Sequence, residues 1–289
     1  SSHVINILED DCWIHWSKNE IGSIIYIPKK GREKKDFKSH EKDFIKDLES
    51  EGTQSKTAIA FKTALNDFIV ATSIRWYRHA IKNDIELGDL CEKISEIEII
   101  GKDTTRSGHK EFPHTAMMFN AVLENESQDK LKKLINKCID EFLDEINNQE
   151  LEKYFESVFL TQFEKPRGMD FSVPEMADLI PFVEAAIQVI LIDKSADNNI
   201  IYLLNSSDEG QNLKYDTHSN LRPKRGAIFI GGHMLGRGIT IEGLITSVFL
   251  RSQSASMMDT NLQMCRWFGH KRSYFDLCSL YIQRHNLNL

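Results

Sequence analysis

The sequence predicts an α/β protein with a mostly parallel sheet flanked by helices, and three observations lead to this fold class. The chain has 289 residues, of which 41% are hydrophobic, so it can bury a large core. Its first half contains long segments with apolar residues at helical spacing. After residue 180 the pattern changes to short apolar runs between polar segments, as in strands that alternate with helices on both faces of a sheet.

The longest expected helix covers residues 55–81, with Ser55 as a plausible cap. Residues 127–147 repeat the amphipathic pattern, and residues 150–163 predict a further helix after a polar break. The short apolar segment 114–123 lies between the first two and predicts a buried strand. The apolar stripe of the first helix consists of Phe61, Leu65, Phe68, Ile69, Thr72 and Trp76.

Five short apolar runs follow residue 180, and each predicts a strand. Parallel sheets of this kind bind their ligands just past the carboxyl ends of their strands. A segment that follows one of these runs is therefore a candidate ligand site. The runs are AAIQVILID (185–193), NIIYLLN (199–205), GAIFIGG (226–232), ITSVFLR (245–251) and DLCSLYIQ (276–283).

The segment GGHMLGRGITIEGL, residues 231–244, follows the apolar run AIFI and contains five glycines. Glycine allows a backbone to approach a ligand closely and to adopt positive φ, so such a cluster is rare in a plain connection. A glycine-rich loop at a strand end suits a phosphate, a nucleotide or a nucleic-acid backbone. We therefore expect a ligand site at this loop.

A second candidate segment lies downstream, where Asp259 and Thr260 can start a short helix that Gly269 can end. This helix carries Gln263 and Arg266. The cations His270, Lys271 and Arg272 stand at its exit.

Clustered cations after a short helix suit a polyphosphate. An arginine directed at a γ-phosphate stabilises the charge that develops during phosphoryl transfer, and its planar fork can hold two oxygens. Arg266 is the first candidate for such an arginine finger, with Lys271 or Arg272 as alternatives.

The motifs GGHMLGRGITIEGL and DTNLQMCRWFGHKRSYFDLC, in this order, resemble the signature of the bacterial Z1 domain, a family often labelled as an endonuclease. The resemblance is densest over residues 226–282 and extends more weakly back to the helix after Ser55. It implies a fold similar to the second RecA-like half of superfamily-two helicases. It also implies a place in large restriction or phage-defence proteins, beside a P-loop ATPase half.

By this resemblance, residues 231–240 correspond to helicase motif five and residues 263–271 to motif six. The resemblance then implies three catalytic residues, which are Arg266, Gln263 and Lys271. The implied nucleotide-binding residues are Gly236, Arg237, Gly238, Thr240, Glu242 and Asp259. The implied DNA-binding residues are Gly231, Gly232, His233 and Arg272.

The sequence predicts three regions. Residues 1–54 are a poorly assigned N-terminal segment, residues 55–180 a mainly helical region, and residues 181–289 the RecA-like α/β core that carries both motifs.

A P-loop is missing, because EGTQSKT (51–57) has the Lys-Thr end of that motif but Ser50 and Ser55 occupy the positions of the phosphate-cradling glycines. We therefore expect ATP with Mg²⁺ to be held mainly by an upstream P-loop domain or a separate ATPase subunit, and this chain to be inactive alone. The expected function is the second half of a DNA-dependent ATPase, with DNA as the other partner.

Two other functions remain open. The first is a non-catalytic module that binds DNA or docks a partner. The second is a Mg²⁺-dependent endonuclease, for which Glu33-x-Lys35 and Asp36-x-Lys38 meet only the spacing condition.

Composition limits the remaining possibilities. The net charge of −7 restricts nucleic-acid contact to local patches such as residues 28–38 and 75–79, which also fit a solvated loop and the polar side of a helix. Five scattered cysteines favour a reducing cytoplasm, and no apolar run is long enough to cross a membrane. His233 has no second histidine at a ligand spacing, so no metal site is expected there.

Overall fold

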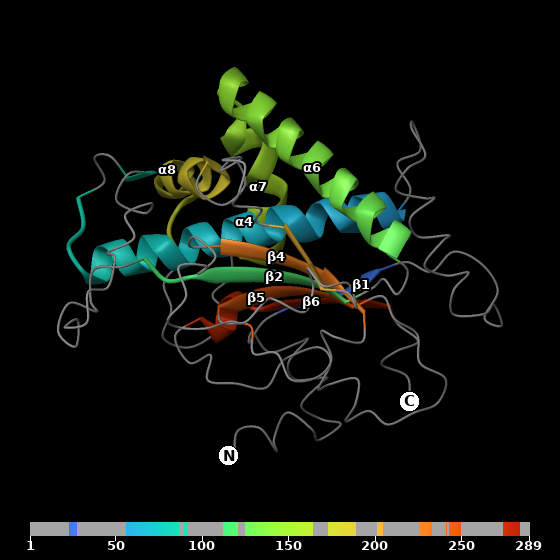
Figure 1. Cartoon of the computed structure of the whole chain (residues 1–289). Helices are drawn as coiled ribbons and strands as arrows, with labels where there is room; N and C mark the ends of the chain where they lie inside the picture. Colours follow the sequence, from blue (N-terminus) through green and yellow to red (C-terminus); the bar gives the residue numbers. More distant parts are fainter. Residues whose placement is uncertain are drawn as a thin grey trace, which may run out of the picture.

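The strands form one six-stranded sheet in the order β1-β6-β5-β2-β4-β3, and every strand pair is parallel (Figure 1). The computed structural model describes residues 23–27, 56–86, 90–91, 112–120, 125–163, 173–188, 201–204, 226–232, 241, 243–249 and 274–283. The prediction of an α/β fold with a parallel sheet is confirmed, but the described helices cover one face of the sheet and not both. The strands are β1 (Ser23–Ile27), β2 (Thr115–Asn120), β3 (Ile201–Leu204), β4 (Gly226–Gly231), β5 (Leu244–Phe249) and β6 (Ser279–Gln283).

Strand β2 lies inside the sheet, between β4 and β5, although it precedes both by more than a hundred residues in the chain. All six of its residues are buried, in agreement with the strand predicted over residues 114–123. Strand β1 forms one edge by pairing with β6. The sheet thus combines strands from the beginning, the middle and the end of the chain.

Helix α4 (Lys56–Lys82) follows the prediction for residues 55–81 to within one residue at each end. Its apolar stripe, from Phe61 through Phe68 to Trp76, is at most 3% exposed. The helix lies along one face of the sheet, where it contacts β1, β2, β5 and β6 (Figure 1). Burial of this stripe on the sheet, rather than intrinsic helix propensity, accounts for most of the stability of such a helix.

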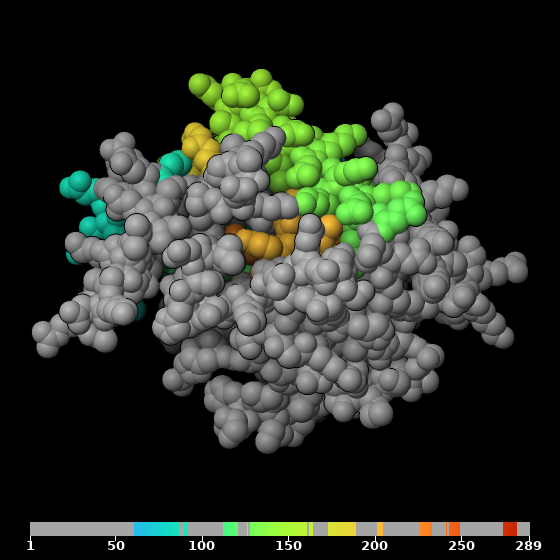
Figure 2. All heavy atoms as spheres, in the orientation of Figure 1, coloured from blue at the N-terminus to red at the C-terminus, as the bar shows by residue number. Residues whose placement is uncertain are grey.

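Helices α6 (Asn125–Asn148) and α7 (Leu151–Gln162) confirm the helices predicted over residues 127–147 and 150–163. Helix α6 contacts β3 and β4, and α7 packs on α4. The helices α4, α6, α7 and α8 (Met176–Ala186) all lie on the same face of the sheet (Figure 1). In the space-filling view α6 forms part of the molecular surface (Figure 2).

One strand prediction is wrong where the structure can test it. Residues 185–186 of the run AAIQVILID end α8 and residues 187–188 continue the helix, while residues 189–193 lie outside the described part. Helix α8 buries one face through Leu179, Phe182 and Val183, which are three and four residues apart. The run AAIQVILID begins only at the end of this helix, and periodicity alone cannot distinguish a short continuous apolar run from a buried strand.

The two faces of the sheet enter different apolar clusters. Met117 and Phe119 of β2 pack with α4, whereas Ala116 and Met118 belong to a second cluster with Phe229 of β4. Successive residues of a strand point to opposite faces, which explains the alternation. Both faces of β2 are fully buried. This arrangement is typical of a parallel strand in the interior of an α/β sheet.

Within the described ranges, no helix is long and apolar enough to cross a membrane.

Candidate ligand site at the carboxyl end of the sheet

The carboxyl ends of four neighbouring strands lie at the same level. Gly231 of β4 is in register with both Leu204 of β3 and Asn120 of β2. Asn120 is in turn in register with Phe249 of β5. Because all strands are parallel, the segments that follow them leave from one edge of the sheet.

The connections that follow β2 and β5 leave this edge in opposite directions across the sheet. The connection after β2 leads towards the edge strand β3. The connection after β5 leads to β6, which lies towards the opposite edge strand, β1. Adjacent strands whose connections leave in opposite directions form a topological switch point, where open α/β sheets bind their ligands. The sheet order therefore places Asn120 and Phe249 at the position where a ligand is expected.

Strand β4 ends at Gly231, next to this switch point, and Gly232 follows it. The glycine-rich segment thus begins at the carboxyl end of an interior parallel strand, as the sequence predicted. Both glycines are buried.

Most of the predicted site residues lie outside the described part of the chain. Of the implied DNA-binding residues, the structure places Gly231 and Gly232 side by side at the end of β4. The predicted residues that lie outside the described ranges are His233, Gly236, Arg237, Gly238, Thr240, Glu242, Asp259, Gln263, Arg266, Lys271 and Arg272.

Asn120 is a residue at this edge that sequence reasoning did not select. Its side chain is fully buried, and neither Oδ1 nor Nδ2 has a hydrogen-bond partner within the described structure. The signal in the sequence is a single polar residue that ends the apolar run AMMF. Only the strand order shows that this residue ends an interior strand beside Gly231.

An aromatic pair lies on the same face as the second apolar cluster. The rings of Tyr202 of β3 and Phe229 of β4 stack with their centroids 5.4 Å apart. Burial raises the pKa of the Tyr202 hydroxyl above its ordinary value of 10.0. This hydroxyl therefore stays protonated at neutral pH.

The opposite, amino end of the sheet is held by a polar network. Arg75 of α4 donates a hydrogen bond from Nη1 to the carbonyl oxygen of His114 over 2.7 Å, and its guanidinium lies 3.9 Å from the ring centroid of Tyr274. The amide of Ala116 donates to the carbonyl oxygen of Gly243 over 2.9 Å. These contacts join the segments that lead into β2, β5 and β6.

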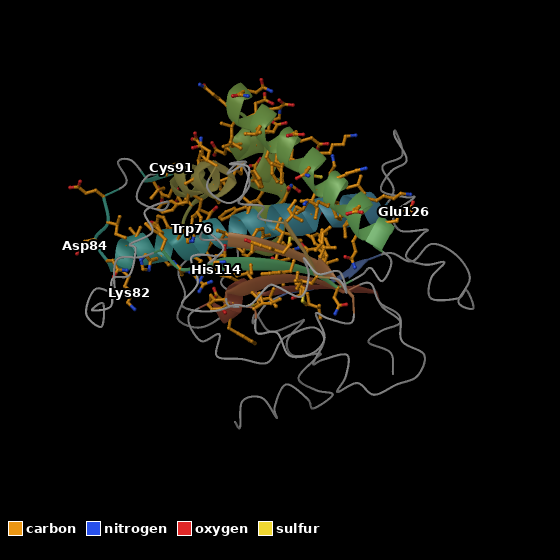
Figure 3. The ribbon with its side chains drawn as sticks, in the orientation of Figure 1. Trp76, Lys82, Asp84, Cys91, His114 and Glu126 are labelled. Atoms are coloured by element: carbon orange, nitrogen blue, oxygen red, sulfur yellow. The ribbon has the colours of Figure 1, made fainter. Side chains whose placement is uncertain are left out.

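Two further contacts of α4 strengthen the same end. The indole Nε1 of Trp76 donates to the carbonyl oxygen of Pro113 over 2.9 Å. The guanidinium of Arg78 forms an ion pair with Asp276, with Nη1 and Oδ2 2.8 Å apart. Figure 3 shows Trp76 and His114 at this end of the fold, whereas Glu126 in the first turn of α6 lies at the other end.

This network changes the interpretation of residues 75–79. The sequence allowed either a nucleic-acid contact or the polar side of a helix, but Trp76 is fully buried and Arg75 and Arg78 bind groups of this chain. The charged side chains of Arg75 and Arg78 therefore stabilise the fold. The other basic patch, residues 28–38, lies outside the described ranges.

No group of three or more histidine, cysteine, aspartate or glutamate side chains that could hold a metal ion occurs among the described residues.

The fold and this edge define the class of the protein: an α/β protein with an all-parallel sheet, in which an interior strand ends in a glycine-rich segment at the switch point. The chain belongs to the Z1 domain family, whose model matches residues 60–288. Comparison with curated proteins and with solved structures gives no match.

Proposed function

We propose that this chain is the second RecA-like half of a DNA-dependent ATPase in a cytoplasmic bacterial restriction or phage-defence system. One structural observation carries the proposal: β4 is an interior strand of a parallel sheet and ends in Gly231 and Gly232 beside the switch point. This is the edge at which such sheets bind nucleotides and other ligands. Membership of the Z1 family and the motif-like segment 259–272 support the same function.

In the proposed mechanism, ATP with Mg²⁺ binds mainly to a P-loop domain upstream or on another subunit. Gln263 and Arg266 then approach the γ-phosphate, and Arg266 stabilises the charge that develops as the phosphoryl group is transferred to water. Closure of the two halves moves the segment after Gly231 along a DNA strand, and release of the products reopens them. This chain supplies the arginine finger and the DNA contacts.

The test is ATP turnover by the longest natural parent protein, with and without DNA, beside its Arg266→Ala variant. Loss of an arginine finger lowers the rate about 10³-fold or more, so turnover should be abolished while the melting temperature stays unchanged. Lys133→Ala is the matched control, because it also removes one positive charge but from an exposed position on α6. Normal DNA-stimulated turnover by Arg266→Ala would refute the role of this residue.

Two other outcomes would replace the proposal. DNA binding without turnover, in a correctly folded parent, would make the chain a DNA-binding or docking module. Mg²⁺-dependent cutting of DNA by this chain alone would make it an endonuclease.

A further inference from the structure

The buried amide of Asn120 has no evident structural role. It ends the interior strand β2, is 0% exposed, and finds no hydrogen-bond partner for Oδ1 or Nδ2 within the described chain. A buried polar group that loses its bonds to water without gaining others destabilises a fold by about 1–3 kcal/mol. Such groups are rare in native proteins, and they are commonly explained by a function or a bound molecule.

The surroundings of Asn120 favour an apolar side chain at this position. By strand alternation its side chain points to the same face as Met118 of the second apolar cluster. A leucine in this place would satisfy that environment at no polar cost. Its neighbour in register on β4 is Gly231, so the position beside the amide carries no side chain. A polar group is thus retained at the strand end, next to a position without a side chain, at the switch point of the sheet.

The two polar atoms of the amide group restrict which kind of ligand can bind there. Nδ2 donates hydrogen bonds and Oδ1 accepts them, so a ligand that satisfies the whole group must offer an acceptor and a donor side by side. A phosphate oxygen only accepts and would leave Oδ1 without a bond. The edge of a nucleobase offers both, and unpaired bases in single strands expose these edges.

We propose that Asn120 binds the edge of a nucleobase in single-stranded DNA at the carboxyl end of the sheet. This inference rests on the proposed function, which brings a DNA strand to this edge. The apolar neighbours Met118 and Phe229 suit the flat face of a base. Since the amide is buried in the unliganded chain, base binding includes a local opening at this end.

The experiment measures the affinity of the full chain for a single-stranded oligonucleotide and for the same oligonucleotide with abasic positions, at several salt concentrations. The test variant is Asn120→Leu. The matched control is Thr246→Val, which removes another fully buried side-chain oxygen without a partner in the described structure, but in the interior of β5. A melting curve confirms that each variant is folded.

The wild-type chain should bind the normal strand more tightly than the abasic strand. Asn120→Leu should weaken binding of the normal strand about tenfold, which is the scale of one good base contact, and leave binding of the abasic strand unchanged. The salt dependence should not change, because phosphate contacts remain. Thr246→Val should bind both strands as the wild type does.

Three results would overturn the inference, and a fourth would overturn the proposed function instead. Unchanged DNA affinity in Asn120→Leu would make the amide irrelevant to binding. Equal losses on both strands would indicate a phosphate contact, and equal binding of both strands by the wild-type chain would show that no base is bound. Failure of the folded wild-type chain to bind any DNA would remove the DNA contact from the proposed function.

Discussion

The two ends of the same sheet differ in how their polar side chains are bound. At the amino end, Arg75, Trp76 and Arg78 of α4 bind a carbonyl oxygen, a second carbonyl oxygen and a carboxylate. Oδ1 of Asp276 and Oγ of Ser279 are buried there without a hydrogen-bond partner in the described structure, but Asp276 is paired through Oδ2. At the carboxyl end, the amide of Asn120 is fully buried, yet no described group binds either of its polar atoms. The amino end has the properties of a structural clamp, and the carboxyl end combines an unsatisfied amide with glycines where parallel sheets bind ligands.

The comparison also shows that charge alone does not identify a binding surface. Arg75 and Arg78 carry positive charges but bind groups of this chain and stabilise the fold. The best-supported ligand group among the described residues is instead the uncharged amide of Asn120. The burial of a side chain and its hydrogen-bond partners distinguish a structural cation from a candidate ligand group.

The largest effect is expected at Gly243, which enters β5 with a φ of +69°. A Cβ atom there would clash with the carbonyl oxygen of His114, which already accepts the hydrogen bond of Arg75. Gly243→Ala should therefore lower the free energy of unfolding by about 4 kcal/mol, because the strained backbone and the forced shift of β2 both contribute. Urea denaturation measures the change.

Gly243→Asn separates the two causes of this effect. Asparagine tolerates positive φ better than alanine does but still carries a Cβ atom. We expect Asn to destabilise almost as much as Ala. A stability close to that of the wild type would show that the backbone angle, and not the contact with His114, requires glycine.

A similar but slightly smaller loss is expected when the ion pair between Arg78 and Asp276 is broken. The side chains are 17% and 4% exposed, so Arg78→Met leaves the carboxylate of Asp276 buried without this partner. Such a change destabilises a protein by about 3 kcal/mol. The double variant Arg78→Met with Asp276→Leu should recover most of the loss. If it is as unstable as Arg78→Met alone, packing rather than charge determines the role of Arg78.

Trp76→Phe should have a moderate effect at the same end. The variant loses the hydrogen bond from Nε1 to Pro113 and part of the edge contact with Phe112. Loss of one buried hydrogen bond and a small cavity predicts a decrease of about 2 kcal/mol in the free energy of unfolding. Thermal unfolding measures this change, and an unchanged melting temperature would show that the indole nitrogen contributes nothing.

The smallest effect, and the one of opposite sign, is expected at the carboxyl end. Asn120→Leu removes a buried amide that no described group satisfies, so the variant should be about 1 kcal/mol more stable than the wild type. Chemical denaturation of the unliganded chain measures the difference. A clear loss of stability would mean that the amide supports the fold, and the contrast between the two ends would then disappear.

The sequence by itself determined the local elements. Helices α4, α6 and α7 and strand β2 lie close to their predicted positions, because the spacing of apolar residues along a chain reports which face of a helix or strand is buried. The exception is the run that begins at the end of α8, because a short continuous apolar run does not distinguish a helix from a buried strand. The two motifs also led to the Z1 family, which the family match confirms.

Only the tertiary structure decided which strands are neighbours and which polar groups find partners. Nothing in the order of segments along the chain places β2 between β4 and β5, because parallel pairing joins residues that are about a hundred positions apart. The same long-range contacts supply partners for Arg75 and none, within the described structure, for Asn120. A side chain's type and its local pattern do not contain this information, since hydrogen-bond satisfaction depends on the groups that folding brings from elsewhere in the chain.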